Sequence, residues 1–419
     1  MARTHKPKFG HMRAETSERA GKSSRGTTQS GVRLYNERLV LSLIRKHQSL
    51  PKAEIARLTG LSAQTVSVIV RQLEGDGLVQ REMPQRGKVG QPLVPFSLNP
   101  DGAYSVGLKV GRRSVDLLLM DLAGTVRNTV HKPYRFPEPG EILAFVKLGL
   151  AELTAGLGKR QKDRISGLGI AAPFEMWNWE DDVGAPRGVL ARWHGFDLRK
   201  EIAAVCDWPV HFCNDATAAC AAELLFGRGH ELRDYAYFYI GYFIGGGIVI
   251  NGALYQGRTG NAGSLGSFPV PAPPGGAQQL IRSASFAVLE RELKRQGLDH
   301  LMLWRDTTDW SAVGPALDAW IASAAVSLAY AGAGVASVIE NAAMVIDGAM
   351  PADVRTRLCA AVTTALQGMN LQGITPFAVI EGTVGAAARA MGAASLPLFA
   401  NFIIDRDVLF KEAPDAQGT

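Results

Sequence analysis

The stretch GLKVGRRSVDLLLMD, from Gly107 to Asp121, holds residue types that could bind a phosphate. Its turn carries three cations, Lys109, Arg112 and Arg113. Ammonium and guanidinium groups pair well with phosphate oxygens, but phosphoryl transfer also needs a carboxylate that holds a magnesium ion. The turn has no such carboxylate. The stretch therefore predicts either a direct phosphate contact or a hairpin whose arginines are solvated, and we favour the second interpretation.

A second candidate site is the pair Asn214-Asp215, which follows the apolar run 208–213. In a cleft, the aspartate could act as a general base or accept a hydrogen bond from a hydroxyl-bearing ligand. The two residues are also good helix caps, and small residues from about 216 to 225 follow them. Of these two interpretations, we favour ligand binding.

Such residues must be positioned by the elements of a mixed α/β domain. After Asn99, strand-like runs alternate with helical ones, which is typical of an α/β architecture. The expected elements are a meander over 104–108, 114–121 and 125–130, a helix over about 141–157, and strands over 165–171, 208–213 and 235–239. The last strand leads into the glycine-rich loop 241–247 and a hairpin that continues from Ile248.

The chain before residue 99 has the pattern of a winged helix-turn-helix. Apolar residues at helical spacing predict helices over 32–44, 52–58 and 63–73, with Gly60 in the turn and Ser62 as the cap of the third helix. This third helix should enter the major groove of DNA, where glutamine can bind adenine and arginine can bind guanine or phosphate. Its outward residues, predicted to contact DNA, are Gln64, Thr65, Ser67 and Arg71.

A wing should follow, built from strands over 77–82 and 93–98 and the loop between them. Arg86, Lys88 and Gln91 lie in this loop and are predicted to contact the phosphate backbone or the minor groove. The alternative is a small helical domain with an ordinary surface loop. The turn glycine, the helix cap, the outward polar residues and the basic loop together favour DNA binding.

Bulk composition fits an ordinary soluble protein. The 419 residues are 47% hydrophobic and 20% charged, with a net charge of +6 and a pI near 9.1. Basic residues among Ser, Thr and Gly predict either a disordered basic arm over the first thirty residues or merely a solvated segment. No apolar run suits a signal peptide or a membrane span. Four cysteines without a C-x-x-C spacing favour a reducing cytoplasm.

Four segments resemble the ROK family of repressors, open reading frames and kinases. They are GLGIAAPFEM, HFCNDATAACAAELLFGRG, YIGYFIGGGIVINGALYQGRTGNAGSLG and AVIEGTVGAAARAMG. The resemblance implies an α/β fold in which a two-lobed, actin-like sugar-kinase domain follows the winged helix-turn-helix. It divides the chain into a basic arm (1–30), a DNA-binding domain (31–98), an effector-binding and oligomerisation domain (99–412, with its cleft near 214–267) and a tail (413–419).

Two departures from the family pattern argue against catalysis. Family kinases have an acidic residue and a Gly-Gly-Thr turn where this chain has KVGRRS (109–114), and a Gly-Thr-Gly-Ile-Gly loop where it has GYFIG (241–245). A lysine thus replaces the metal-binding carboxylate, and aromatic rings stand where the phosphates need bare backbone. We therefore expect no kinase activity and no catalytic residue. Asp215, at the position of the kinase base, should only bind ligand.

By the same resemblance, the effector cleft should hold Asn214, Asp215, Ser264 and Ser267. The two serines replace a sugar-binding glutamate and a zinc-binding histidine of the family. The other zinc ligands of the family are cysteines, and the corresponding loop 268–280 has none, so we expect neither a metal nor a cofactor. The expected ligand is a sugar or a sugar derivative, whose identity stays open.

The expected partners are double-stranded operator DNA, a small sugar effector and a second copy of the chain, and no membrane. One winged module makes few base contacts, so a homodimer or a dimer of dimers should read paired half-sites. Ligand binding in the cleft should change lobe closure and so DNA affinity. We expect a cytoplasmic protein associated with the bacterial nucleoid. Two alternatives stay open: an active sugar kinase fused to a DNA-binding domain, and a DNA-binding protein without an effector.

Overall fold

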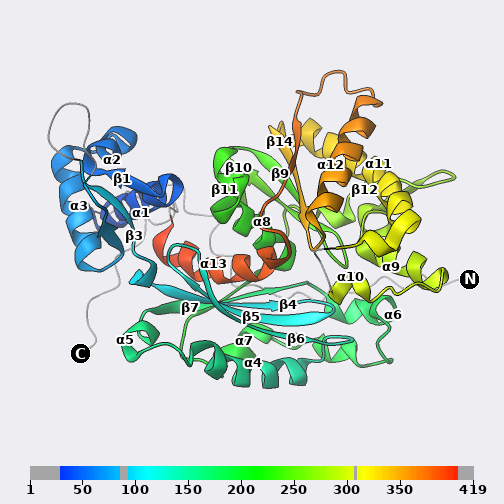
Figure 1. Cartoon of the computed structure of the whole chain (residues 1–419), viewed down its shortest axis with the longest axis horizontal. Helices are drawn as coiled ribbons and strands as arrows, with labels where there is room; N and C mark the ends of the chain where they lie inside the picture. The colour runs from blue at the N-terminus through cyan, green and yellow to red at the C-terminus, as the bar shows by residue number, and fades with distance from the viewer. Residues whose placement is uncertain (1–28, 85–92, 306–308, 404–419) are drawn as a thin grey trace, which may run out of the picture.

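The computed structural model describes residues 29–84, 93–305 and 309–403. Figure 1 shows the amino-terminal module (blue) at one end of the molecule, beside two α/β lobes that lie against each other. Each lobe is built on its own five-stranded sheet. The expected fold, a winged helix-turn-helix followed by a two-lobed α/β domain, is confirmed.

The amino-terminal module is three helices packed on a small sheet. Its helices are α1 (Gln29–His47), α2 (Lys52–Thr59) and α3 (Ala63–Gly75), and its strands are β1 (Ser49–Pro51), β2 (Val79–Arg81) and β3 (Pro95–Leu98) in the antiparallel order β1-β3-β2. Gly60 ends α2 with a φ of 70°, and the Ser62 hydroxyl accepts the Thr65 amide at 3.1 Å to begin α3. The short strand β1 was not expected from the sequence.

The amino-terminal lobe has the strand order β6-β5-β4-β7-β8. Its strands are β4 (Tyr104–Val110), β5 (Ser114–Asp121), β6 (Val126–Pro133), β7 (Ile165–Ala172) and β8 (Val210–Asn214). Helices α4 (Pro139–Thr154) and α7 (Leu198–Ala203) lie against one face of this sheet (Figure 1), and the short helices α5 (Lys159–Lys162) and α6 (Glu180–Val183) lie in its connections. Buried apolar side chains from the sheet, α4 and α7 form its core.

The carboxyl-terminal lobe has the strand order β11-β10-β9-β14-β15. Its main strands are β9 (Tyr235–Ile240), β10 (Gly245–Ile250), β11 (Ala253–Tyr255), β14 (Ala343–Gly348) and β15 (Ala378–Glu381), and a separate hairpin joins β12 (Pro269–Pro271) to β13 (Ala277–Gln279). Its helices are α9 (Phe286–Arg295), α10 (Met302–Arg305), α11 (Gly314–Ile339) and α12 (Ala352–Gln367). Helix α11 is long and apolar enough to match a membrane span by length and composition, but most of it is buried within the lobe.

Strand β9 shows how the sequence sets the two faces of this sheet. Side chains alternate along a strand, so the run YAYFYI places three tyrosines on one face and Ala236, Phe238 and Ile240 on the other. The tyrosines pack against helix α8 (Asp215–Phe226), whereas the other three join the core that includes α11 and α12. Both faces of the strand are therefore buried.

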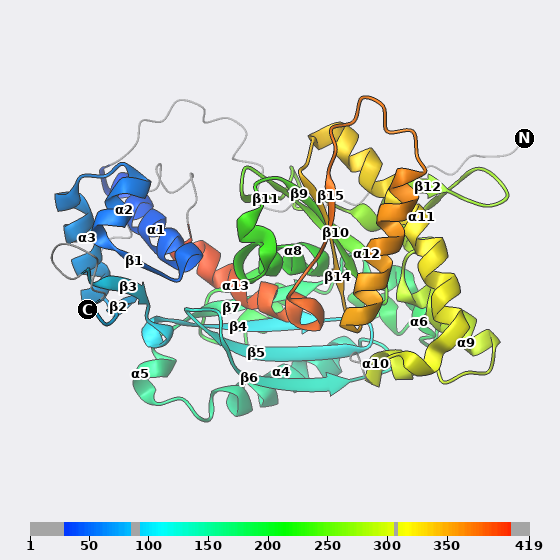
Figure 2. The same cartoon turned by 45° about the horizontal axis from the view of Figure 1, so that its top comes forward.

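Helices α8 and α13 (Ala388–Phe402) cross between the lobes (Figure 2). A Cβ added at Gly392 would lie 1.8 Å from the carbonyl oxygen of Ala218, so only glycine allows the two backbones to approach this closely. Gly169 of β7 has the same role beneath α13, where a Cβ would lie 1.8 Å from the Ala393 oxygen. Helix α13 is thus fixed against both α8 and the amino-terminal sheet.

The last turn of α13 also holds the amino-terminal module. Arg38 of α1 donates a hydrogen bond of 2.7 Å to the carbonyl oxygen of Ala400, and Arg45 donates one of 2.8 Å to the Leu122 oxygen. Phe402 packs against the core of the module and against the cluster around α13. The module is therefore anchored to the larger domain by apolar packing and by arginines that satisfy backbone carbonyls.

Candidate DNA-binding face and effector cleft

Helix α3 presents a mixed polar and apolar face at the end of the molecule. Gln64 and Arg71 are exposed, while Thr65 and Ser67 are half-buried. The Thr65 hydroxyl lies 2.8 Å from the Ser62 hydroxyl, so part of its hydrogen-bonding capacity is used in the helix cap. The opposite face of α3 is buried through Val66, Ile69, Val70 and Leu73. All four residues predicted from the sequence thus lie off the buried face.

Val68 belongs to the same outward face and was missed in the sequence analysis. Its side chain is 60% exposed, on the same side of α3 as the exposed Gln64 and Arg71. An aliphatic group here can contact a thymine methyl in the major groove. The available signal was its place on the polar side of a helix whose other aliphatic residues share one face. The predicted wing residues Arg86, Lys88 and Gln91 lie outside the described residues.

The β4–β5 hairpin is held together by a buried lysine. Lys109 is 6% exposed, and its ammonium donates hydrogen bonds to the Ser114 hydroxyl at 2.6 Å and to the Asp116 carboxylate at 2.7 Å. Burial lowers the pKa of Lys109, although the negative charge of Asp116 opposes that effect. His131 from β6 pairs with the same carboxylate. Lys109 therefore belongs to a buried ion network with Asp116 and His131, and its ammonium does not project from the turn.

Arg112 fills the space between the lobes. Its guanidinium carbon lies 3.8 Å from the ring centroid of Trp179 and 4.3 Å from that of Phe243. Trp179 belongs to the amino-terminal lobe and Phe243 to the 241–245 loop of the other lobe. Because a guanidinium over an aromatic ring gains cation–π attraction, this packing joins the lysine-and-arginine turn to the aromatic loop.

Arg113 forms the second connection between the lobes. It donates to the carbonyl oxygen of Arg135 at 2.7 Å and pairs with Glu290 of α9 at 3.2 Å, while its guanidinium lies 5.0 Å from the Tyr242 ring centroid. The expectation that Arg112 and Arg113 are solvated is therefore wrong: Arg112 is only 8% exposed and Arg113 is hydrogen-bonded. The aromatic side chains of the 241–245 loop provide the faces on which both guanidinium groups pack.

The pair Asn214-Asp215 begins helix α8. The Asn214 side chain accepts the Ala216 amide at 2.9 Å and so caps the helix. Asp215 is 8% exposed and pairs at 3.3 Å with Arg389, which comes from the first turn of α13 and lies 5.0 Å from the Tyr239 ring centroid. The Asn214 side-chain oxygen and the Asp215 carboxylate thus both have partners within the protein.

Arg389 was missed as a site residue, although a signal was present. It is the only charged residue between Glu381 and Asp405. A lone cation among small and apolar residues indicates a buried partner, because an unpaired charge is costly to desolvate. The sequence could not identify that partner, since Asp215 lies 174 positions away.

Ser264 precedes the short helical turn Leu265–Ser267 and Ser267 ends it, and both serines are exposed. The Ser264 hydroxyl donates to the Asn261 oxygen at 2.7 Å. Their loop packs on the glycine-rich strand, because a Cβ at Gly263 would lie 2.7 Å from the Gly247 Cα. That strand also touches the first turn of α8, where a Cβ at Gly245 would meet the Ala216 Cβ at 2.6 Å. The loop that carries the two serines and the first turn of α8 therefore both pack against the glycine-rich strand β10.

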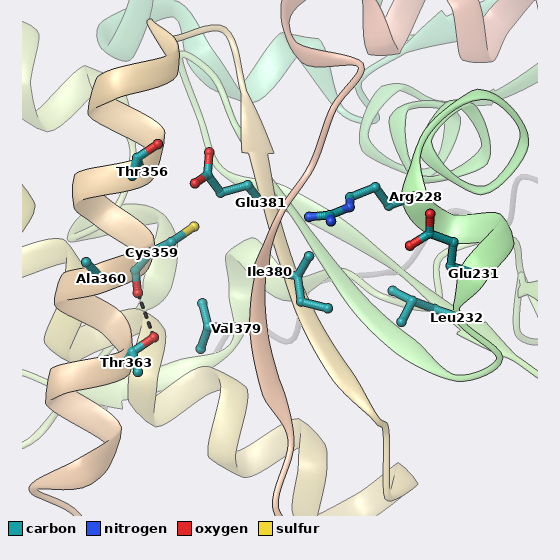
Figure 3. Close-up of a pocket in the computed structure, with 10 residues that line it drawn as sticks. All are labelled: Arg228, Glu231, Leu232, Thr356, Cys359, Ala360, Thr363, Val379, Ile380 and Glu381. Atoms are coloured by element: carbon teal, nitrogen blue, oxygen red, sulfur yellow. Dashed lines mark hydrogen bonds between the residues drawn. The ribbon is translucent and has the colours of Figure 1, made fainter.

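Two cavities stand out, and the predicted effector residues line neither. One, of about 220 Å³, lies between the lobes next to Arg113 and Tyr242. The other, of about 490 Å³, lies at the free edge of β15 (Figure 3), between the Thr356–Thr363 face of α12 and the Arg228–Leu232 turn. Burial raises the pKa of Cys359 in this larger cavity to about 12, so its thiol is protonated and unreactive at neutral pH.

Comparisons with known proteins agree with the architecture. Residues 105–279 match the model of the ROK family, and residues 33–80 match a winged helix-turn-helix DNA-binding model. An uncharacterized protein of Sinorhizobium fredii, y4fQ, is 26% identical over 88% of this chain and 91% of its own length. The xylose repressor of Bacillus subtilis is 28% identical over 58% of this chain and 62% of the repressor, which is less than two thirds of its length.

Solved structures share the fold at lower identity. A ROK family transcriptional regulator, described as a homolog of the Escherichia coli MLC protein, aligns with a TM-score of 0.63 and 21% identity over 91% of this chain and 98% of its own. A ROK family glucokinase from Streptomyces griseus, solved with glucose and AMPPNP, aligns with a TM-score of 0.55 and 20% identity over 70% of this chain and 99% of its own. The regulator alignment spans nearly the whole chain, and the glucokinase alignment spans 70% of it.

Proposed function

We propose, from the premise that the chain joins a winged helix-turn-helix to a ROK-family domain, that it is a transcriptional repressor which binds operator DNA and responds to a sugar or a sugar derivative. The observation that carries this proposal is the exposed face of α3, where Gln64, Val68 and Arg71 point away from the core of a module anchored to the larger domain. These side chains suit base edges in a major groove. Its similarity to xylose repressors supports a role in carbohydrate metabolism.

The same proposal makes the ROK domain a receptor and not a kinase. The turn where family kinases hold metal and phosphate is occupied by the Lys109–Asp116 ion pair, and Arg112 stacks on the aromatic loop where the second phosphate loop would be. A nucleotide would have to displace both interactions. An ATP-coupled assay with hexoses and pentoses tests this part, and turnover would favour the kinase alternative. Neither a metal nor a cofactor has a part in the proposed function.

Regulation would act through helix α13. Arg389 in its first turn pairs with Asp215 at the start of α8, and the Ala400 carbonyl in its last turn accepts the Arg38 hydrogen bond from the amino-terminal module. A hydroxyl-rich ligand that hydrogen-bonds Asp215 competes with Arg389 for the same carboxylate. A shift of α13 in response would reach the module directly, because one helix contacts both places.

Fluorescence anisotropy on the DNA upstream of the protein's own gene tests the repressor directly. We expect the full chain to bind this duplex much more tightly than a random duplex at the same salt concentration, and a panel of free sugars to contain one that changes the affinity. Arg38→Ala should keep the DNA affinity but reduce the effect of that sugar. Equal affinity for the two duplexes would contradict the proposal. In it, the protein works in the bacterial cytoplasm as a homodimer or a dimer of dimers on paired half-sites.

A further inference from the structure

The smaller cavity, which we call the interlobe pocket, is built from both lobes. The amino-terminal lobe contributes Arg113, and the carboxyl-terminal lobe contributes Tyr242 and one face of α9 with Glu290, Arg291 and Lys294. Its volume of about 220 Å³ is below the range of drug-sized sites, about 300 to 1,000 Å³. The pocket therefore suits a small ligand and not a nucleotide.

The lining residues of the interlobe pocket carry a surplus of positive charge. Arg113, Arg291 and Lys294 contribute three cations, and Glu290 contributes one carboxylate, which leaves a net charge of +2. Glu290 is almost fully buried, and its two oxygens are already engaged: Arg113 and Lys294 bind one at 3.2 and 2.6 Å, and the Trp304 indole donates to the other at 2.7 Å. The carboxylate thus positions two of the cations, while the exposed Arg291 adds a third.

We propose that the interlobe pocket binds a phosphate dianion, either free or as the phosphate of a small monoester. A phosphate group carries a charge of about −1.5 to −2 at pH 7, which matches the surplus of the pocket. Guanidinium groups match phosphate geometry through paired N–H donors, and two arginines meet here. The side chain of Lys294 is half exposed, so it can turn toward an anion while remaining near Glu290.

The interlobe pocket is distinct from the predicted effector site, since none of the residues predicted to bind the effector lines it. Because Arg113 and α9 belong to different lobes, an anion that contacts both adds a bridge beside the Arg113–Glu290 ion pair. Ligand binding here stabilises the contact between the lobes by mass action. The proposal does not depend on DNA binding, so a failure of operator binding would leave it untouched.

Isothermal titration calorimetry of the full chain in a chloride buffer tests the pocket, with inorganic phosphate, glucose 6-phosphate and glucose as the three probes. We expect saturable binding of at least one phosphate-bearing probe and none of glucose at the same concentrations. Arg291→Ala should weaken phosphate binding by at least about tenfold, because a hydrogen bond to a charged group contributes that much or more. Tighter binding of glucose 6-phosphate identifies a monoester as the ligand, and tighter binding of phosphate identifies the free anion.

Arg295→Ala is the matched control, because Arg295 lies on the same helix, is exposed, and pairs with Glu292 outside the pocket. It should bind phosphate as the natural chain does. Arg291→Glu, which reverses the charge at an exposed position, should abolish binding while leaving the melting temperature without ligand unchanged. Equal phosphate affinity in the natural chain and in both Arg291 variants would overturn the proposal, since binding would then occur elsewhere. Failure of both phosphate probes to bind at concentrations up to about 10 mM would overturn it as well.

Discussion

Arg113 of the amino-terminal lobe and Glu290 of the carboxyl-terminal lobe form an ion pair of 3.2 Å, and only 2% of the Glu290 side chain is exposed. Arg112, the preceding residue, stacks on Trp179 and Phe243. Two consecutive arginines of one turn thus connect the lobes, Arg113 through an ion pair and the Tyr242 ring and Arg112 through the rings of Trp179 and Phe243. The hydrophobic core of the amino-terminal lobe extends into the same contact, because it includes Tyr242 and Ala287.

The ion pair gives a stability prediction. Glu290→Gln keeps the size of the side chain but removes the charge that Arg113 and Lys294 share, so a partly buried guanidinium loses its partner. We expect the free energy of unfolding to fall by about 1–3 kcal/mol, measured by urea denaturation. Glu292→Gln, on the same helix but paired with the exposed Arg295, should leave stability almost unchanged. Equal effects of the two substitutions would contradict a special role for Glu290.

His131 gives a prediction of pH dependence. Its hydrogen bond to Asp116 raises the pKa of the imidazole above the ordinary value of 6.5. A raised pKa in the folded state means that protonated His131 stabilises the fold, fully so below about pH 6.5, and that this contribution is lost as the pH rises through the folded pKa. The difference in melting temperature between the natural chain and His131→Gln should therefore be larger at pH 5.5 than at pH 8.5. A difference that does not change with pH would count against the pair.

The crossing of α8 and α13 gives a packing prediction. Gly392→Ala places a methyl group 1.8 Å from the Ala218 oxygen, so the helices must separate. We expect the free energy of unfolding to fall by at least about 3 kcal/mol. This exceeds the usual cost of overpacking because the backbone, and not only a side chain, must move. Thermal and urea unfolding measure the loss. Gly156→Ala, at an exposed position where a Cβ meets nothing within 4 Å, is the control and should have little effect.

The recognition helix gives a prediction about DNA specificity. Gln64→Ala and Arg71→Ala should each weaken operator binding by about 1–3 kcal/mol and random-duplex binding much less, because contacts to base edges carry the specificity. Val68→Ala should lower specificity more modestly through a lost methyl contact. Lys88→Ala, predicted from the sequence to contact phosphate, should weaken both and reduce the salt dependence. Equal losses on both duplexes for Gln64 and Arg71 would contradict the assignment of α3 as the recognition helix.

Most of the fold could be predicted from local sequence signals. Helical spacing of apolar residues marked α3, and the Asn214-Asp215 pair marked the boundary between β8 and α8. Each of these signals depends on neighbouring residues alone. Strand β1 was missed because its three residues are too few to show the alternation of buried and exposed side chains that marks a strand. Its pairing with β3 also joins residues 44 or more positions apart.

The partners of the buried arginines could not be predicted in the same way. Arg112 and Arg113 looked like solvated turn residues, since their aromatic partners are contributed by loops that only tertiary packing brings together. Arg389 was visible as an isolated charge, but its partner Asp215 was not. Long cationic side chains bury their aliphatic parts, and the tertiary structure decides which groups their charged ends contact. Sequence position alone therefore says little about where such a side chain ends.

The anchorage of Arg38 on the Ala400 carbonyl affects how this protein can be recombined with its relatives. A graft that exchanges only residues before 99 transfers the arginine without the helix end that receives it. An exchange that also includes the last turn of α13, through Phe402, keeps both Arg38 and the carbonyl group that it binds. Hybrid regulators made from this scaffold should therefore combine two separate stretches of the chain, one from each end.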